Sequence, residues 1–218
     1  MTRSLAAQAD TTASPPAISP NATTTRIAGG AAIAAPLLLL ASTVAFLTEG
    51  DGINDGFVGG TLGVWSALAF TLAFVGIFRV LEFRAPRAAP IWLSVSLMGW
   101  AAGVGFNLDA IFAAEFGRET VDTSAEDRPF TILAYLPWGW MAPLGLIAAG
   151  VLMRRTNTFG RMSALLMIAA GVLFVTARPA RMGPLAIFAD CITVLALVPV
   201  GWALLAISRT TSSAKEAS

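Results

Sequence analysis

The chain has 218 residues, of which 56% are hydrophobic and only 12% are charged, and its formal net charge is +1. A soluble domain carries about 25% charged residues. This composition therefore excludes an ordinary soluble protein and predicts an all-α, polytopic membrane protein.

Two residue types are scarce enough to exclude whole classes of chemistry. The sequence has no His, which excludes His-ligated haem, His-containing zinc or copper sites, and Ser-His or Cys-His catalysis. Its single Lys, Lys215, lies in the C-terminal tail, so a buried retinal-type Schiff base is excluded. Its single cysteine, Cys191, permits neither an internal disulfide nor a CxxC redox pair.

Six apolar segments of membrane-spanning length follow one another along the chain, and they predict six transmembrane helices in one bundle within a domain at 26–208. The expected spans are 27–47, 58–81, 91–114, 131–153, 159–177 and 184–207. Residues 1–25, rich in Ala, Thr, Ser and Pro, are expected to form a disordered tail, and 209–218 a polar one. A signal peptide is the alternative for the first apolar run, but its roughly twenty residues favour a retained span.

The loop at 48–57, with the sequence TEGDGINDGF, carries three acidic residues and faintly resembles a calcium loop. Ile53 stands where an EF-hand requires Asp or Asn, and no Glu follows at the twelfth position. A solvated acidic turn is the better interpretation.

The third segment, GWAAGVGFNLDAIFAAE at 99–115, has small residues at intervals of four on two sides. The two series are Gly99, Gly103, Asn107 and Ala101, Gly105, Asp109, Ala113. Residues four apart share a helical face, and small residues allow close helix contact in membranes. The pattern predicts a central helix that is approached from two directions, with Gly103 and Gly105 as close contacts.

The beginning of the fourth segment contains Tyr135, Pro137, Trp138 and Trp140, a pattern typical of an interfacial aromatic anchor. The alternative is a lid of aromatic side chains over a binding pocket, which would suit a cationic or planar solute. Pro143 is expected to bend this span, and Pro199 is expected to kink the sixth.

The basic residues are unevenly divided between the two sides of the predicted bundle. One side receives Arg3, Arg26, Arg79, Arg84, Arg87, Arg154, Arg155, Arg161, Arg209 and Lys215, and the other receives Arg118, Arg128, Arg178 and Arg181. The positive-inside rule then predicts a multi-pass protein of the inner (plasma) membrane, with both termini in the cytoplasm. The acidic loops at 48–57 and 115–129 would lie outside.

The block at 144–177, LGLIAAGVLMRRTNTFGRMSALLMIAAGVLFVTA, resembles an uncharacterised family of six-span bacterial membrane proteins. The sequence Arg-Ile-Ala-Gly at 26–29 and the run at 189–205 share this resemblance. The resemblance implies six spans and a short basic turn between the fourth and fifth. That family has no established activity, so it implies no function.

Several polar residues are predicted to converge in the outer half of the bundle. Asn107 and Asp190 each lie about 10 Å inside their spans at 1.5 Å per residue, and Asp109 is one turn shallower. Arg178 and Arg181 are the expected partners, because buried charges are normally paired. A structural pair of Arg178 with Asp190 or Asp109 would lock spans three, five and six together, whereas an outward-facing pocket would make these groups a binding site.

Two functions remain open at this point. The first is a small-solute binding or transport protein, with ligand-binding candidates Asn107, Asp109, Asp190, Arg178, Trp138 and Tyr135. The second is a non-catalytic accessory subunit of a membrane complex. The absence of catalytic motifs argues against an enzyme, and no cofactor, metal or nucleic acid is expected. The expected partners are the lipid bilayer, a small solute, and another membrane protein or a second copy of the chain.

Overall fold

A computed structural model describes residues 21–116, 137 and 139–216. These residues form α1 (Ala22–Thr48), α2 (Phe57–Glu82), α3 (Ala88–Phe116), α5 (Met141–Thr156), α6 (Arg161–Ala177) and α7 (Gly183–Glu216). Within these ranges the regular structure is helical, apart from an isolated bridge between Gly52 and Asp55. The all-α prediction is therefore confirmed for the described part of the chain.

Four of these helices are long and apolar enough to cross a membrane: α1, α2, α3 and the part of α7 at 183–210. Helix α6 is apolar but has only 17 residues, and α5 has 16. The hydrophobic core of a bilayer requires about twenty helical residues. The described chain thus has the character of a helical membrane protein, with two helices shorter than a full span.

The predicted spans coincide with helices, but several boundaries differ. Helix α1 begins at Ala22, inside the predicted N-terminal tail, and α7 continues to Glu216, through most of the predicted C-terminal tail. The fourth predicted span begins at 131, whereas α5 begins at Met141. Residues 131–136 and 138 lie outside the described part of the chain.

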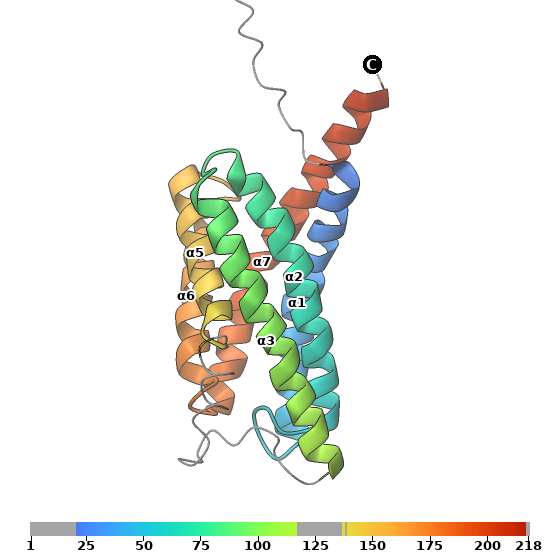
Figure 1. Ribbon diagram of the computed structural model, residues 1–218, viewed down its shortest axis with the longest axis vertical. Coiled ribbons are helices and arrows are strands. Elements are labelled where there is room, and N and C mark those ends of the chain that lie inside the picture. The colour runs from blue at the N-terminus through green and yellow to red at the C-terminus, as the bar shows by residue number, and fades with distance from the viewer. Residues whose placement is uncertain (1–20, 117–136, 138, 217–218) are drawn as a thin grey trace, which may run out of the picture.

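The six described helices form a ring in which each packs against its neighbours (Figure 1). Helix α1 packs between α2 and α7, α3 packs between α2 and α5, and α6 packs between α5 and α7. The α1–α2 loop and the α6–α7 turn lie at one end of this ring (Figure 1), which we call the α1–α2 end. The α2–α3 and α5–α6 connections lie at the other.

The prediction that 99–115 belongs to a central helix is wrong. In the most apolar stretch of α3 only 17% of the residues are buried, against 50% in α1 and in α2. Helix α2 instead has contacts across the ring, with α5 and α7. Its Phe70, Phe74 and Phe78, which are spaced by four, are almost fully buried. The Phe70 ring stacks on Trp100 of α3 with 3.9 Å between ring centroids.

Close approach between α3 and α5 is limited to one part of α3. A Cβ atom on Gly99 would overlap the backbone nitrogen of Ala142, and one on Gly145 would overlap the side chain of Ser96. At Gly103, by contrast, the nearest atom to an added Cβ would be the Cβ of Ala67 at 3.6 Å, an ordinary van der Waals distance. The prediction that Gly103 marks a close helix contact is therefore wrong.

Pro143 is the third residue of α5, so it lies in the first helical turn. Backbone N–H groups in the first turn have no partner within the helix, so proline disrupts no bond of α5 there. The expected bend within the fourth span stays a prediction, because residues 131–136 and 138 lie outside the described part of the chain. Pro199 lies inside α7.

The α1–α2 loop is a compact turn. Asp55 donates its backbone N–H to the carbonyl of Gly52 at 3.1 Å, and Asn54 has a positive φ of 66°. Ile53 is 2% exposed and packs in a small cluster with Ala177 and Ala186 of α6 and α7. Ile53, which broke the calcium-loop pattern, therefore attaches this loop to the α6–α7 turn.

Candidate solute cavity and the adjoining ion pair

A buried ion pair joins the C-terminal end of α6 to α7. Arg178, which follows α6, donates from Nη2 to Asp190 of α7, at 3.1 Å to Oδ2 and 3.3 Å to Oδ1. The Asp190 side chain is fully buried, and that of Arg178 is 12% exposed. Asp190 is seven residues after Gly183, or about 10 Å along the helix at 1.5 Å per residue, so its charge requires a partner. The predicted pairing of Asp190 with Arg178 is confirmed.

A hydroxyl from α1 completes this arrangement. Thr43 is fully buried; its Oγ1 donates to Asp190 Oδ2 at 2.5 Å and accepts from Arg178 Nη2 at 2.7 Å. The ion pair therefore joins α6, α7 and α1. The expectation that it would join spans three, five and six is wrong in that respect, because α1 and not α3 lies beside α7.

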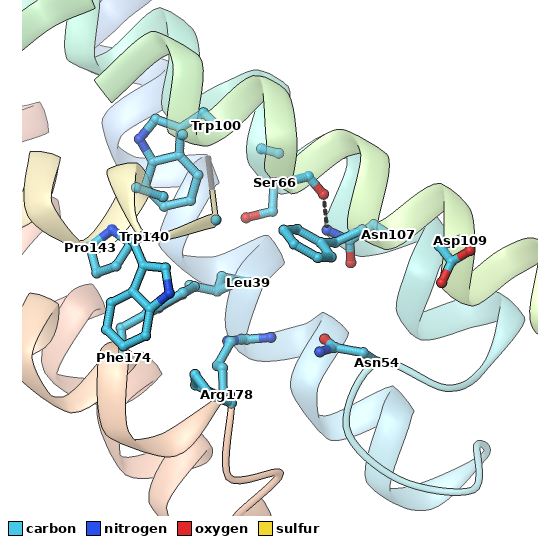
Figure 2. A pocket seen from close by; sticks show the side chains of 18 of the residues that line it. Leu39, Asn54, Ser66, Trp100, Asn107, Asp109, Trp140, Pro143, Phe174 and Arg178 are labelled. Atoms are coloured by element: carbon cyan, nitrogen blue, oxygen red, sulfur yellow. Dashed lines mark hydrogen bonds between the residues drawn. The ribbon is translucent and has the colours of Figure 1, made fainter. Parts of the chain in front are cut away.

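A cavity of about 280 Å³ lies at the α1–α2 end of the ring, with Arg178 in its wall (Figure 2). Helix α3 contributes Trp100, Phe106, Asn107 and Asp109, and the opposite wall contains Trp140, Phe174 and Arg178. Leu39 and Ser66 come from α1 and α2, and the α1–α2 loop contributes Asn54 and Asp55. The lining is mostly apolar and aromatic with a few polar groups, which is the usual character of small-molecule sites.

Helices α3 and α5 both line the cavity, α3 with Gly99 and Gly103 and α5 with Ala142 and Pro143. The two helices touch at Gly99 and Gly145, and from Gly103 onward α3 continues toward the α1–α2 end. Helix α5 begins only at Met141, directly beside that contact. Gly103 adds space to the cavity by having no side chain, and a Cβ atom on Gly139, before α5, would lie 2.9 Å from the Phe106 ring of α3.

Asn107 lines the cavity and is also fixed in place by the protein. Its Nδ2 donates to the carbonyl of Gly103 on its own helix at 2.7 Å (Figure 2). Its side chain lies so close to Gly63 of α2 that a Cβ there would overlap it. Gly63 therefore allows a polar residue of α3 to pack tightly against α2.

The remaining predicted site residues differ in their relation to the cavity. Asp109 lines the cavity from α3, closer to the helix end than Asn107 (Figure 2). Asp190 is absent from the lining and reaches it only through Arg178. Trp138 and Tyr135 lie outside the described residues, so their anchor and lid alternatives stay predictions. Trp140, which was grouped with them, lines the cavity and is 41% exposed.

Sequence reasoning missed several contributors, among them Thr43, Phe174 and Trp100. Thr43 could have been recognised as a candidate, because it follows Ser42 and the two polar residues stand in an otherwise apolar run. Phe174 places its ring against the Arg178 guanidinium, with 5.0 Å from Cζ to the ring centroid. Its spacing of four from Arg178 is the signal that could have placed both side chains on one helical face. Nothing in the sequence around Trp100 distinguishes a residue in the wall of a cavity from a residue in the core.

No protein-family model, curated protein or solved structure matches this chain. The class of protein therefore rests on the helices, and the resemblance to a six-span bacterial family stays a prediction. The fold and its apolar helices define a helical membrane-embedded protein.

Proposed function

We propose that this chain is a six-span integral membrane protein that binds or transports a small solute, with its site in the cavity beside Arg178. The observation that carries the proposal is a cavity between apolar helices whose wall contains the charged and largely buried side chain of Arg178. Charged residues inside transmembrane segments are costly, and they commonly mark solute or ion pathways.

The size and lining of the cavity fit a small solute better than a large one. Its volume of about 280 Å³ lies just below the roughly 300–1,000 Å³ of drug-sized ligand pockets. The aromatic side chains would cover the solute, and Arg178 and Asn107 would orient it. The alternative, an accessory subunit without a ligand, leaves the cavity without a role.

The proposed orientation places the cavity in the outer half of the membrane. Arg79, Arg84 and Arg87 follow one another near the α2–α3 connection, and Arg154 and Arg155 end α5, all at the end of the ring opposite the cavity (Figure 1). By the positive-inside rule that end is cytoplasmic.

Labelling of single cysteines tests the orientation. In a Cys191→Ala background, Asp51→Cys lies in the α1–α2 loop and Arg87→Cys in the α2–α3 connection, and both positions are exposed. In intact cells, a membrane-impermeant maleimide is expected to label the cysteine at 51 immediately and the one at 87 only after permeabilisation. The reverse pattern would place the cavity on the cytoplasmic side.

Filling the cavity tests the site. Gly103→Leu is expected to place a side chain in the cavity and to abolish the thermal stabilisation that solutes give the purified protein. Gly30→Leu is the matched control, because Gly30 is exposed on α1 and an added Cβ meets nothing within 4 Å. The measurement is the melting temperature in detergent across a panel of anionic, neutral and cationic small molecules. If no solute stabilises the unmodified protein, or if every stabilising solute acts equally on Gly103→Leu, the proposed site is wrong.

A further inference from the structure

Arg178 uses only part of its hydrogen-bonding capacity. Among the described residues, all its hydrogen bonds run from Nη2, to Thr43 and Asp190. Nε is buried and has no partner in that part of the chain. A guanidinium carries five N–H donors, and its strongest contacts with acidic groups use two nitrogens side by side. The contact with Asp190 is therefore not the two-nitrogen contact that Arg can form.

The counter-charge of Arg178 is kept out of the cavity. Asp190 is fully buried behind Arg178, and the cavity lining includes Arg178 but not Asp190. A solute that reaches this part of the cavity meets a group that only donates hydrogen bonds. Buried N–H groups without partners are unfavourable, so an acceptor on the solute would relieve this arrangement.

Two polar neighbours already use donor groups within the protein, whereas the buried Nε1 of Trp100, like Nε of Arg178, has no partner among the described residues. Asn107 already donates to Gly103, and Ser66 donates its hydroxyl hydrogen to the carbonyl of Ala35 at 2.9 Å. Phe174 lies against the Arg178 guanidinium, and Trp140 and the polar residue Asn54 line the same cavity (Figure 2). The wall thus places a cationic donor beside aromatic surface. Arg181 is a second cationic side chain in the lining, and Asp55 and Asp109 are its carboxylates.

We propose that the cavity binds an acidic group carried on a small apolar or aromatic body. The acidic oxygens accept hydrogen bonds from Arg178, and the body lies against Phe174 and Trp140. This inference rests on the proposed function and names the chemical class of its solute. A free carboxylate and the head group of an anionic lipid share this chemistry, and the experiment separates them.

Asp190 would then set the affinity through its charge. Its carboxylate neutralises Arg178 from behind, which keeps Arg178 stable in the empty cavity and limits attraction for an anion. Removing that charge is expected to tighten binding of an anion, whereas removing Arg178 is expected to abolish it. A merely structural ion pair predicts no effect of either change on binding.

The test measures binding of benzoate, benzamide and benzylamine to the full-length protein in detergent, by melting temperature and by quenching of tryptophan fluorescence. Benzoate is expected to bind at least tenfold more tightly than the neutral and cationic analogues. Arg178→Gln is expected to weaken benzoate binding at least tenfold, and Asp190→Asn to tighten it several-fold. Arg79→Gln, at the opposite end of the ring, is the matched control and is expected to change nothing.

Because Arg178→Gln leaves Asp190 buried without its partner, the double variant with Asp190→Asn keeps the test valid if the single variant does not fold. It removes both charges and is expected to lose benzoate binding while retaining its fold. Benzoate binding within twofold of the unmodified protein in this variant would overturn the inference.

The remaining outcomes separate the inference from the proposed function. If benzamide or benzylamine binds more tightly than benzoate and Gly103→Leu abolishes that binding, the cavity is a solute site but the anion inference is wrong. If none of the three probes binds, both the anion inference and the proposed function fail.

Competition in nanodiscs identifies the source of the acidic group. Arg178-dependent displacement of benzoate by phosphatidylglycerol, but not by phosphatidylcholine, supports the anion and assigns it to a lipid head group. Equal benzoate binding in both lipids supports a free carboxylate.

Discussion

Asp190→Asn is expected to lower the free energy of unfolding by about 3 kcal/mol, because it leaves the Arg178 guanidinium buried beside a neutral amide. The side chain of Arg178 is 12% exposed, so water cannot fully replace the lost charge. Asparagine keeps an oxygen that can accept from Thr43, so the loss reports mainly the charge. Reversible unfolding in mixed micelles measures it.

Arg178→Gln should partly rescue Asp190→Asn, because the double variant contains no uncompensated buried charge. The coupling between the two changes is expected to be large, since residues in direct contact depart from additivity by about 0.5–3 kcal/mol. Additive effects of the two changes would show that the pair does not hold α6 and α7 together.

An exposed ion pair provides the comparison. Arg79 and Glu82 of α2 lie 3.5 Å apart, with side chains 66% and 41% exposed. Pairs of this kind contribute about 0–1 kcal/mol, so Arg79→Gln should leave stability nearly unchanged. If Arg79→Gln lowered the free energy of unfolding as much as Asp190→Asn does, the burial of the ion pair would not explain the effect of Asp190→Asn.

The ion pair was predictable from the sequence, whereas its surroundings were not. An acidic residue inside an apolar helix requires a partner, and Arg178 is placed at a suitable depth by the preceding span. That Thr43 bridges the two depends on α1 lying beside α7, a contact between residues 147 positions apart. Helical periodicity describes one helix at a time, so it carries no information on that neighbour.

The small residues of α3 also show that the pattern of one helix does not identify its neighbours. Their spacing predicted close packing on two faces, and the structure uses Gly99 in that way but leaves space at Gly103. A glycine in a membrane helix is equally suitable for a close contact or for the wall of a cavity. The difference depends on the neighbouring helices, because Gly99 meets the backbone of Ala142 in α5, whereas Gly103 faces Ala67 and Trp100.

Gly99→Leu is expected to lower the free energy of unfolding by more than about 3 kcal/mol, at the upper end of the usual cost of overpacking. An added Cβ at Gly99 meets the backbone of Ala142 and not a flexible side chain, so α3 and α5 must separate. Separation would also disturb the contact between Ser96 and Gly145 one turn away. Even Gly99→Ala is expected to be destabilising.

Gly103→Leu, on the same helix and the same face, is expected to leave stability unchanged or to raise it by up to about 1 kcal/mol. Leucine has the higher helix propensity by about that amount, and an added Cβ finds its nearest neighbours at 3.6 Å on Ala67 and 3.9 Å on Trp100. Unfolding of the two variants under identical conditions makes the comparison. Equal losses would remove the distinction between contact and cavity on α3, and equal tolerance would show that α3 and α5 are not packed closely at Gly99. The expected contrast instead gives a folded protein whose cavity is filled, which is the variant required to separate loss of binding from loss of structure.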